Sequence, residues 1–221
     1  MNLRPAVTPS PEPPQPCVYV VDDDRSVLKG LSRLLSSAGY NVKAFDSPEE
    51  FLRQHDPEMP GCVLLDIGMS ELDGLSLQAR LSDDEGRRAI IFITARDDAQ
   101  TGVHAMKAGA LDYLTKPVQD ATLLASVAKA IDFDQRSRRH HAELVELQKM
   151  FRQLTAREVE VLRHVIRGRL NKQIAYDLGI VEKTVKVHRA RLMEKLQVRS
   201  VAELVRLGER LGIGANGGGN A

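Results

Sequence analysis

Residues 62–66 read CVLLD, four apolar residues followed by a carboxylate, and residues 67–74 continue as IGMSELDG. A short apolar run of this kind is typical of a strand buried on both faces of a parallel sheet. The acid at its end, Asp66, would then lie at the edge of that sheet. Ligands of open α/β sheets bind beyond the carboxyl ends of the strands. The stretch therefore predicts an α/β fold with Asp66 at a binding site.

Three other apolar runs, over 18–21, 90–93 and 113–115, also end in polar residues. The polar residues that follow them are Asp22, Asp23, Thr94 and Lys116. Parallel neighbouring strands bring their carboxyl ends to one edge of a sheet. We therefore expect three carboxylates, a hydroxyl and an ammonium group to converge on one pocket.

Helical patterns separate these runs. Apolar residues recur at helical spacing over 27–38, and Gly39 follows them. Ser47 precedes a proline and two glutamates, which is the pattern of a helix start. Further helices are expected over about 75–81, with an acidic turn at 82–86, then over about 99–108 and after 117. Five strands that alternate with five helices predict an α/β, doubly wound, five-stranded parallel sheet of the flavodoxin-like type.

The length of 221 residues favours two domains. The hydrophobic content of 43% is enough for real cores, and an aromatic content of 4% predicts that these cores are mainly aliphatic. Lysine and arginine number 17 against 23 aspartates and glutamates over 1–150, but 14 against 7 over 151–221. An acidic half joined to a basic half predicts a metal or phosphate site beside a polyanion-binding domain.

The ends of the chain differ in composition from its body. Residues 1–16 contain six prolines and are expected to form a disordered arm, and the glycine-rich residues 213–221 a flexible tail. Cys17 and Cys62 are expected to be buried thiols. The chain contains no apolar stretch of about 20 residues and no apolar signal core, so we expect a cytoplasmic protein without membrane contact.

Residues 134–150 are strongly charged and predict a helical linker. An apolar stripe with spacings of 3, 4 and 3 runs through Leu144, Leu147, Phe151 and Leu154. This stripe also fits a short coiled-coil seam between subunits, although it is too short to establish heptads. We therefore expect the α/β domain at 17–133, the linker at 134–150 and a further domain at 151–212.

The last domain is expected to be all-α with four helices. Thr155 and Glu158 form a capping pattern at the first helix, and Gly168 ends it. Further helices are expected over about 171–178, 182–196 and 201–211. Two short helices joined by a tight glycine turn favour a helix-turn-helix.

The helix over 182–196 has two different faces. Its inner side is expected to carry Val185, His188, Leu192 and Leu196. The outer side carries small and cationic residues, namely Lys183, Lys186, Val187, Ala190 and Arg191, and Thr184 stands near the helix start. Lysine can bind guanine edges or phosphates, and small apolar side chains can touch a thymine methyl group, so this face predicts binding in a major groove.

The acidic pocket also predicts a chemistry. Asp22 and Asp23 could hold Mg2+, which prefers hard oxygen ligands. Asp66 could be a further ligand and also a nucleophile, because carboxylates form aspartyl-phosphates. Lys116 would counter the phosphoryl charge, and Thr94 would donate a hydrogen bond to a phosphoryl oxygen.

The stretch 17–133 resembles the receiver domain of bacterial response regulators. The matching segments are Val21-Asp22-Asp23, Leu65-Asp66 with Met69 and Asp73-Gly74, Phe92-Ile93-Thr94-Ala95, Met106-Lys107-Ala108-Gly109-Ala110 and Asp112-Tyr113-Leu114-Thr115-Lys116-Pro117. The resemblance implies that Asp66 is the phosphoacceptor and that Gly68 gives a backbone carbonyl to the metal. It also implies that Tyr113 changes rotamer with Thr94 and that the Lys116-Pro117 bond is cis. Ser70 and Ala89 stand where the family usually has proline.

The stretch 150–212 resembles the LuxR-type helix-turn-helix, and the whole chain resembles the NarL/FixJ class, in particular its FixJ-type branch. The matching segments are Leu154-Thr155, Arg157-Glu158, Asn171-Lys172, Ile174-Ala175-Tyr176-Asp177-Leu178-Gly179-Ile180, Thr184-Val185-Lys186, His188-Arg189-Ala190 and Lys195-Leu196. The resemblance implies base contacts from Lys186, Val187 and Ala190, and DNA contacts from Asn171 and Lys172. Leu170 and Val181 stand where the family has capping serine or threonine, and Ala190 where it often has a long side chain.

We therefore expect a transcription regulator and not an enzyme. A sensor histidine kinase would phosphorylate Asp66 with Mg2+ as cofactor, and a homodimer would then bind double-stranded promoter DNA. Two alternatives are a phosphohydrolase that uses an aspartyl-phosphate and a DNA-binding protein whose receiver no longer signals. The first needs a second acid for proton transfer, but Gly68 stands two residues beyond Asp66. The complete set of acids, threonine and lysine argues against the second.

Overall fold

The computed structural model describes residues 14–69, 74–83, 88–95 and 99–213. The chain divides into two compact units, 1–138 and 139–221. The expected terminal arm, for residues 1–13, and the expected tail, for residues 214–221, lie outside the described residues, as do Ser70 and the turn residues 84–86. In the described part of the chain, no helix is both long and apolar enough to cross a membrane.

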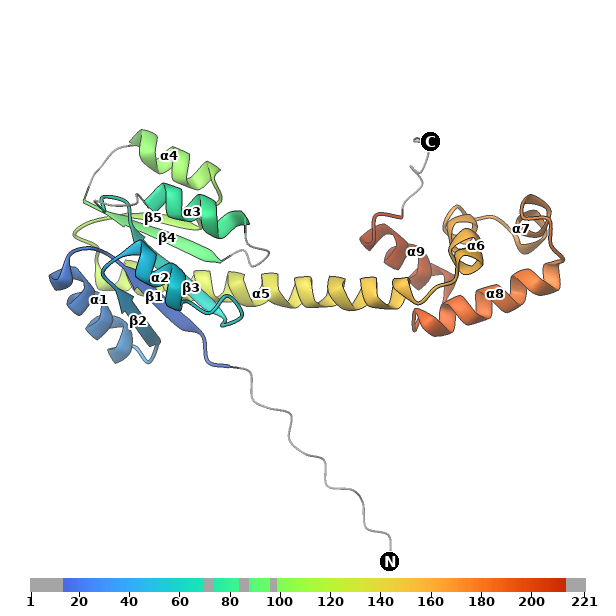
Figure 1. Ribbon diagram of the computed structural model, residues 1–221, viewed down its shortest axis with the longest axis horizontal. Coiled ribbons are helices and arrows are strands. Elements are labelled where there is room, and N and C mark those ends of the chain that lie inside the picture. The colour runs from blue at the N-terminus through green and yellow to red at the C-terminus, as the bar shows by residue number, and fades with distance from the viewer. Residues whose placement is uncertain (1–13, 70–73, 84–87, 96–98, 214–221) are drawn as a thin grey trace, which may run out of the picture. The chain divides into compact units, whose positions relative to one another are not determined.

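The first unit is built on a parallel sheet of five described strands in the order β2-β1-β3-β4-β5. Figure 1 shows that strands and helices alternate along this unit. The strands are β1 (Cys17–Val21), β2 (Asn41–Phe45), β3 (Gly61–Asp66), β4 (Ala89–Thr94) and β5 (Asp112–Thr115). This order and direction confirm the doubly wound sheet expected from the sequence.

Helices cover both faces of the sheet. They are α1 (Arg25–Ser37), α2 (Pro48–Gln54), α3 (Gly74–Asp83), α4 (Ala99–Lys107) and α5 (Asp120–Arg152). Helices α2, α3 and α4 pack on one face, and α1 and α5 pack on the other. Both faces of β1, β3 and β4 are buried, which explains why these strands have no polar alternation in the sequence.

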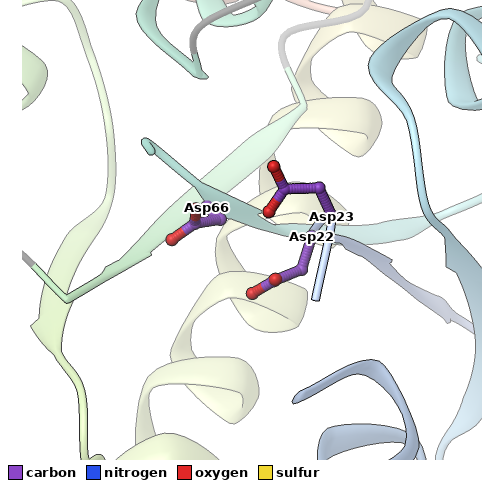
Figure 2. Close-up of side chains that lie close together, drawn as sticks. All are labelled: Asp22, Asp23 and Asp66. Atoms are coloured by element: carbon purple, nitrogen blue, oxygen red, sulfur yellow. The ribbon is translucent and has the colours of Figure 1, made fainter. Parts of the chain in front are cut away.

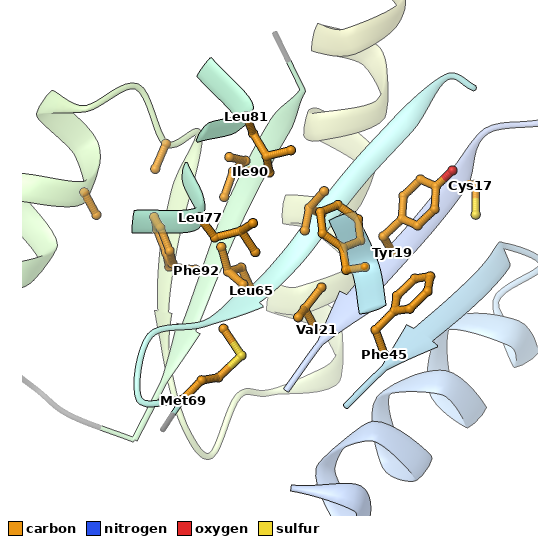
Figure 3. Packing of buried hydrophobic residues seen from close by; sticks show 14 residues of the cluster. Cys17, Tyr19, Val21, Phe45, Leu65, Met69, Leu77, Leu81, Ile90 and Phe92 are labelled. Carbon is orange, nitrogen blue, oxygen red and sulfur yellow. The ribbon is translucent and has the colours of Figure 1, made fainter. Parts of the chain in front are cut away.

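The core on the α2–α4 face contains more aromatic residues than the composition suggested. Figure 3 shows Tyr19, Phe45 and Phe92 in this cluster together with Leu65 and Met69. The Tyr19 and Phe45 rings lie at centroid distances of 5.6 and 5.5 Å from the ring of Phe51, both edge-on. The core on the α1–α5 face is built of aliphatic side chains and Cys62. The buried aromatic side chains of the first unit are thus concentrated on one side of the sheet.

The helix α5 is held at the amino end of β3 by a buried carboxylate. Asp134 accepts hydrogen bonds from the Gly61 N–H and from Nε of Arg138, both at 2.9 Å. The guanidinium of Arg138 also donates to the carbonyls of Pro57, Glu58 and Met59. The expected linker, 134–150, therefore lies inside one continuous helix whose first part belongs to the first unit.

The second unit contains α6 (Ala156–Ile166), α7 (Asn171–Asp177), α8 (Glu182–Lys195) and α9 (Val201–Arg210), which confirms the expected all-α domain. Thr155 caps α6 through the capping box with Glu158 that the sequence predicts. Leu147 is buried in the core of this unit, and Phe151 and Leu154 pack against that core. The end of the stripe that also fitted a coiled coil is thus covered by helices of the same chain.

Candidate functional site

The strand ends that the sequence singles out meet at one edge of the sheet. Strand β3 lies between β1 and β4, and β5 pairs with β4. The register aligns Val21 with Leu65, Asp66 with Ile93, and Thr94 with Thr115. Asp22, Asp66, Thr94 and Lys116 are consequently at the carboxyl ends of adjacent strands, where a doubly wound sheet binds its ligands.

Three carboxylates form a cluster at this edge, as Figure 2 shows. One oxygen from each of Asp22, Asp23 and Asp66 lies within 4.8 Å of the others. Asp22 and Asp66 are buried, and Asp23 is exposed to solvent. Two buried acids next to an exposed one form a site that small ions can reach from one side.

Lys116 forms ion pairs with both buried acids. Its Nζ atom lies 2.6 Å from Oδ2 of Asp22 and 3.2 Å from Oδ1 of Asp66. The bond between Lys116 and Pro117 is cis, as the resemblance implies. Lysine, which has three donors and no acceptor, can bind both carboxylates at once.

Burial and charge shift the pKa values of Asp22 and Lys116 in opposite directions. Burial raises the pKa of the Asp22 carboxyl, and hydrogen bonds from Lys116 and from the Asp24 N–H only partly offset it. Burial alone would lower the pKa of Lys116, but its hydrogen bond to Asp22 and the charge of both acids raise it. The ammonium group is therefore charged at neutral pH and available to balance added negative charge.

The remaining predicted residues surround the same edge. Thr94 is 1% exposed at the end of β4. The Gly68 N–H donates to Oδ2 of Asp66 at 3.0 Å, so the loop after β3 turns back onto the acid. Tyr113 is half-buried on β5, and Gly102 of α4 lies beside its ring.

Gly74 is a residue to which the sequence reasoning gave no role. A Cβ atom at this position would lie 2.6 Å from the carbonyl oxygen of Asp66 and 3.0 Å from the ring of Phe92. The absence of a side chain therefore lets the start of α3 approach the end of β3. The signal in the sequence was a glycine eight residues after an acid at a strand end, but only the structure shows what it contacts.

The donor set of the pocket suits a hard divalent cation. Mg2+ binds oxygen ligands at about 2.0–2.1 Å in an octahedron, which places adjacent ligand atoms about 2.9 Å apart and opposite ones about 4.1 Å apart. Carboxylate oxygens within 4.8 Å of one another can close to that spacing with small rotations of the side chains. Lys116 would have to share Asp22 and Asp66 with such a cation.

In the second unit, α7 and α8 form the helix pair with a short connection that the sequence favours. Val185 and Leu192 are buried on the inner side of α8, and Nδ1 of His188 is buried without a hydrogen-bond partner among the described residues. The outer side carries the exposed Lys183, Lys186, Val187, Ala190 and Arg191. Thr184 and Asn171 are half-buried, and Lys172 is exposed.

The starts of these two helices lack side-chain caps, because Leu170 and Val181 stand where the family has a capping serine or threonine. Leu170 is 69% exposed and Val181 is 68% exposed. The Leu170 N–H instead donates to Oε1 of Gln173 at 2.9 Å. Half of a capping box is thus preserved at α7 without a capping hydroxyl.

Comparison with known proteins agrees with this architecture. Residues 18–128 match the family "Response regulator receiver domain", and residues 152–207 match "Bacterial regulatory proteins, luxR family". The chain is 41% identical over 194 residues to the response regulator protein TmoT of Ectopseudomonas mendocina, with 88% of each chain covered. It is 36% identical over 196 residues to the transcriptional regulatory protein FixJ of Bradyrhizobium diazoefficiens, with 89% of this chain and 96% of FixJ covered.

The solved structure of the response regulator StyR covers 89% of this chain and 99% of its own, with 45% identity and a TM-score of 0.79. These matches extend over both units, and they confirm the expected class and the expectation that the protein is no enzyme. The chain belongs to the NarL/FixJ class of two-component response regulators, the phosphorylation-activated transcription regulators that join a receiver domain to a LuxR-type DNA-binding domain.

Proposed function

We propose that a sensor histidine kinase transfers a phosphoryl group to Asp66. An Asp66 carboxylate oxygen would form the new P–O bond while the P–N bond to the kinase histidine breaks, and the imidazole of the kinase keeps the electron pair and takes up a proton. The observation that supports this best is the position of Lys116 at the sheet edge. Its Nζ atom lies 2.6 Å from a carboxylate oxygen of Asp22 and 3.2 Å from one of Asp66. Asp66 would be the nucleophile because it is the last residue of β3, the strand between β1 and β4.

Mg2+ would be held by carboxylates of Asp22, Asp23 and Asp66 and by the backbone carbonyl of Gly68. When bound, it would screen the incoming phosphoryl group from the acids and stabilise its charge. Lys116 would move with the new charge, since its ammonium already faces Oδ1 of Asp66. Thr94 would donate its hydroxyl to a phosphoryl oxygen, and Tyr113 would change rotamer with it.

The second unit would read promoter DNA through α8. Lys186, Val187 and Ala190 would face base edges, because they share the exposed side of that helix. The remaining proposed DNA contacts are Asn171, Lys172, Lys183, Thr184 and Arg191. Phosphorylation would produce a homodimer on a two-fold DNA site in the cytoplasm. The proposed domains are 17–133 and 151–212, joined by 134–150.

The test is incubation of the full chain with a small phosphodonor and Mg2+, followed by mass spectrometry and sedimentation with and without DNA. We expect a gain of one phosphoryl group that Asp66→Asn abolishes, together with a shift to dimer and tighter DNA binding. Asp46→Asn is the matched control, because Asp46 is an exposed acid paired with Arg25 outside the pocket. Labelling that survives in Asp66→Asn would refute the assignment. DNA binding that is indifferent to labelling would favour a receiver that no longer signals.

A further inference from the structure

A side-chain contact joins the two helices of the proposed DNA-binding pair. Arg189 lies on α8, and its Nη1 atom donates a hydrogen bond to Oδ1 of Asn171, the first residue of α7. Both residues are half-buried. Arg189 is therefore tied to the neighbouring helix, while Ala190 and Arg191 beside it are exposed on the outer side of α8.

The chemistry of this contact fixes the orientation of the Asn171 amide. A guanidinium group has only donors, so the amide atom that faces Arg189 must be the oxygen. The amide nitrogen, with its two N–H donors, then points away from Arg189. An asparagine without such a partner can turn its amide over at little cost and present either atom.

The direction of the amide matters for a group that contacts the DNA backbone. Phosphate oxygens only accept hydrogen bonds, so they are bound by N–H and O–H donors. Asn171 with its nitrogen outward offers two donors to a phosphate. With its oxygen outward it would repel the phosphate.

We propose that Arg189 is a positioning residue for DNA binding, which holds the Asn171 amide with its donors toward a DNA phosphate. This inference rests on the proposed function of the α7–α8 pair. It assigns Arg189 an indirect role, distinct from the direct contacts of Lys183 or Arg191. It also explains why a cation on α8 is directed at α7.

The central comparison uses the phosphorylated full chain and a labelled duplex that the wild-type protein enriches from a random-sequence pool. Fluorescence anisotropy would give the affinity at several salt concentrations. We expect Asn171→Ala and Arg189→Met each to weaken binding roughly fivefold to tenfold, the worth of one typical hydrogen bond. The double variant should bind no more weakly than either single variant, because both changes remove the same contact.

Two conservative variants separate positioning from other roles. Arg189→Gln keeps an N–H donor for Asn171 but removes the charge, so we expect it to retain the affinity and the salt dependence of the wild type. Asn171→Asp keeps a partner for Arg189 and should leave the melting temperature unchanged or raised, but it has no donor and should bind DNA weakly. A merely structural clasp between α7 and α8 would predict that Asn171→Asp loses affinity only through its added negative charge, so that this loss disappears at high salt concentration.

Arg191→Gln and Arg199→Gln serve as controls. The first removes a proposed direct contact and should reduce the salt slope by about one phosphate contact. Arg199 lies at an exposed turn before α9, so its change should have no effect. The inference is overturned if Arg189→Gln lowers the salt slope as Arg191→Gln does, or if the effects of Asn171→Ala and Arg189→Met add. A wild-type protein that enriches no duplex would instead overturn the proposed DNA-binding function itself.

Discussion

Lys116 Nζ lies 2.6 Å from Oδ2 of Asp22 and so joins the segment after β5 to the segment after β1. The two residues are 94 positions apart in the sequence. This ion pair, with the contact of Lys116 to Asp66 at 3.2 Å, occupies oxygens that a divalent cation would need. Lys116 and a bound divalent cation would therefore compete for the same acids.

The first prediction concerns this competition. Lys116→Met should bind Mg2+ at least about tenfold more tightly than the wild type, because a charge about 4 Å away is worth a few kcal/mol at a protein surface. The binding can be measured by isothermal titration calorimetry of the unphosphorylated chain. Lys107→Met, which removes an exposed lysine of α4, is the control and should bind like the wild type. Equal affinity in Lys116→Met and the wild type would contradict the argument.

The second prediction concerns the carboxylate that holds α5. Asp134 is 1% exposed and accepts from Gly61 and Arg138, so Asp134→Asn should destabilise the first unit by about 1–3 kcal/mol. Asp132→Asn is the matched control, since Asp132 pairs with Arg136 at the same i,i+4 spacing but is 60% exposed as a side chain. That change should cost less than about 0.5 kcal/mol. Hydrogen exchange of the loop at 56–59 would measure the destabilisation in both variants. Equal destabilisation by Asp134→Asn and Asp132→Asn would contradict the argument from burial.

The third prediction concerns the start of β3. Gly61 has a φ of +143°, and a Cβ atom there would lie 1.8 Å from the carbonyl oxygen of Cys17. Gly61→Ala should therefore cost more than about 2 kcal/mol of unfolding free energy. Gly30→Ala on α1 meets open space in a helix and should instead stabilise by up to about 1 kcal/mol. Denaturant unfolding followed by circular dichroism would separate them, and a neutral Gly61→Ala would be inconsistent with the close approach.

The fourth prediction is a pH dependence in the second unit. Glu158 is 2% exposed, and its carboxylate lies 2.7 Å from Nζ of Lys195. Burial would raise its pKa, but the hydrogen bonds from Lys195 and Thr155 outweigh burial and lower it. A carboxyl whose pKa is lower in the folded state stabilises the fold above its unfolded pKa of about 4.3. That contribution is lost as the pH falls through the folded value.

Glu158→Gln should therefore destabilise α6 by roughly 1–2 kcal/mol at neutral pH, with a difference from the wild type that shrinks below about pH 4. Hydrogen exchange of α6 amides at several pH values measures this difference. Glu160→Gln removes an exposed acid paired with Arg157 and should change stability by less than about 0.5 kcal/mol. A difference between wild type and Glu158→Gln that grows toward acid pH would reverse the sign and refute the assignment.

The fifth prediction separates base contacts from phosphate contacts on α8. Lys183→Ala should weaken binding to all duplexes alike and reduce the salt slope by about one. Val187→Ala removes a 42% exposed apolar side chain and should reduce discrimination between sequences by up to about 1 kcal/mol, with the salt slope unchanged. Anisotropy titrations with an enriched duplex and its single-base variants would show the difference. If Lys183→Ala instead changed sequence discrimination and Val187→Ala changed the salt slope, the two residues would have the opposite roles.

Much of the fold follows from local patterns. Asp66 was placed at a strand end because an apolar run of strand length stops there, and Thr155 was placed at a helix start because Glu158 follows three residues later. Both depend on neighbours within a few residues. The aromatic cluster of Tyr19, Phe45 and Phe51 was not foreseen, because the composition gives the number of aromatic residues but not their face of the sheet.

The sequence by itself determined the alternation of strands and helices, the acids at the strand ends and the cationic side of α8, because hydrophobic period and capping are local properties. Only the tertiary structure decided which distant groups meet. Lys116 reaches Asp22, Arg138 reaches the carbonyls at 57–59, and Arg189 donates a hydrogen bond to the amide oxygen of Asn171. Such contacts depend on strand order, helix packing and side-chain rotamers, which no spacing in the sequence encodes.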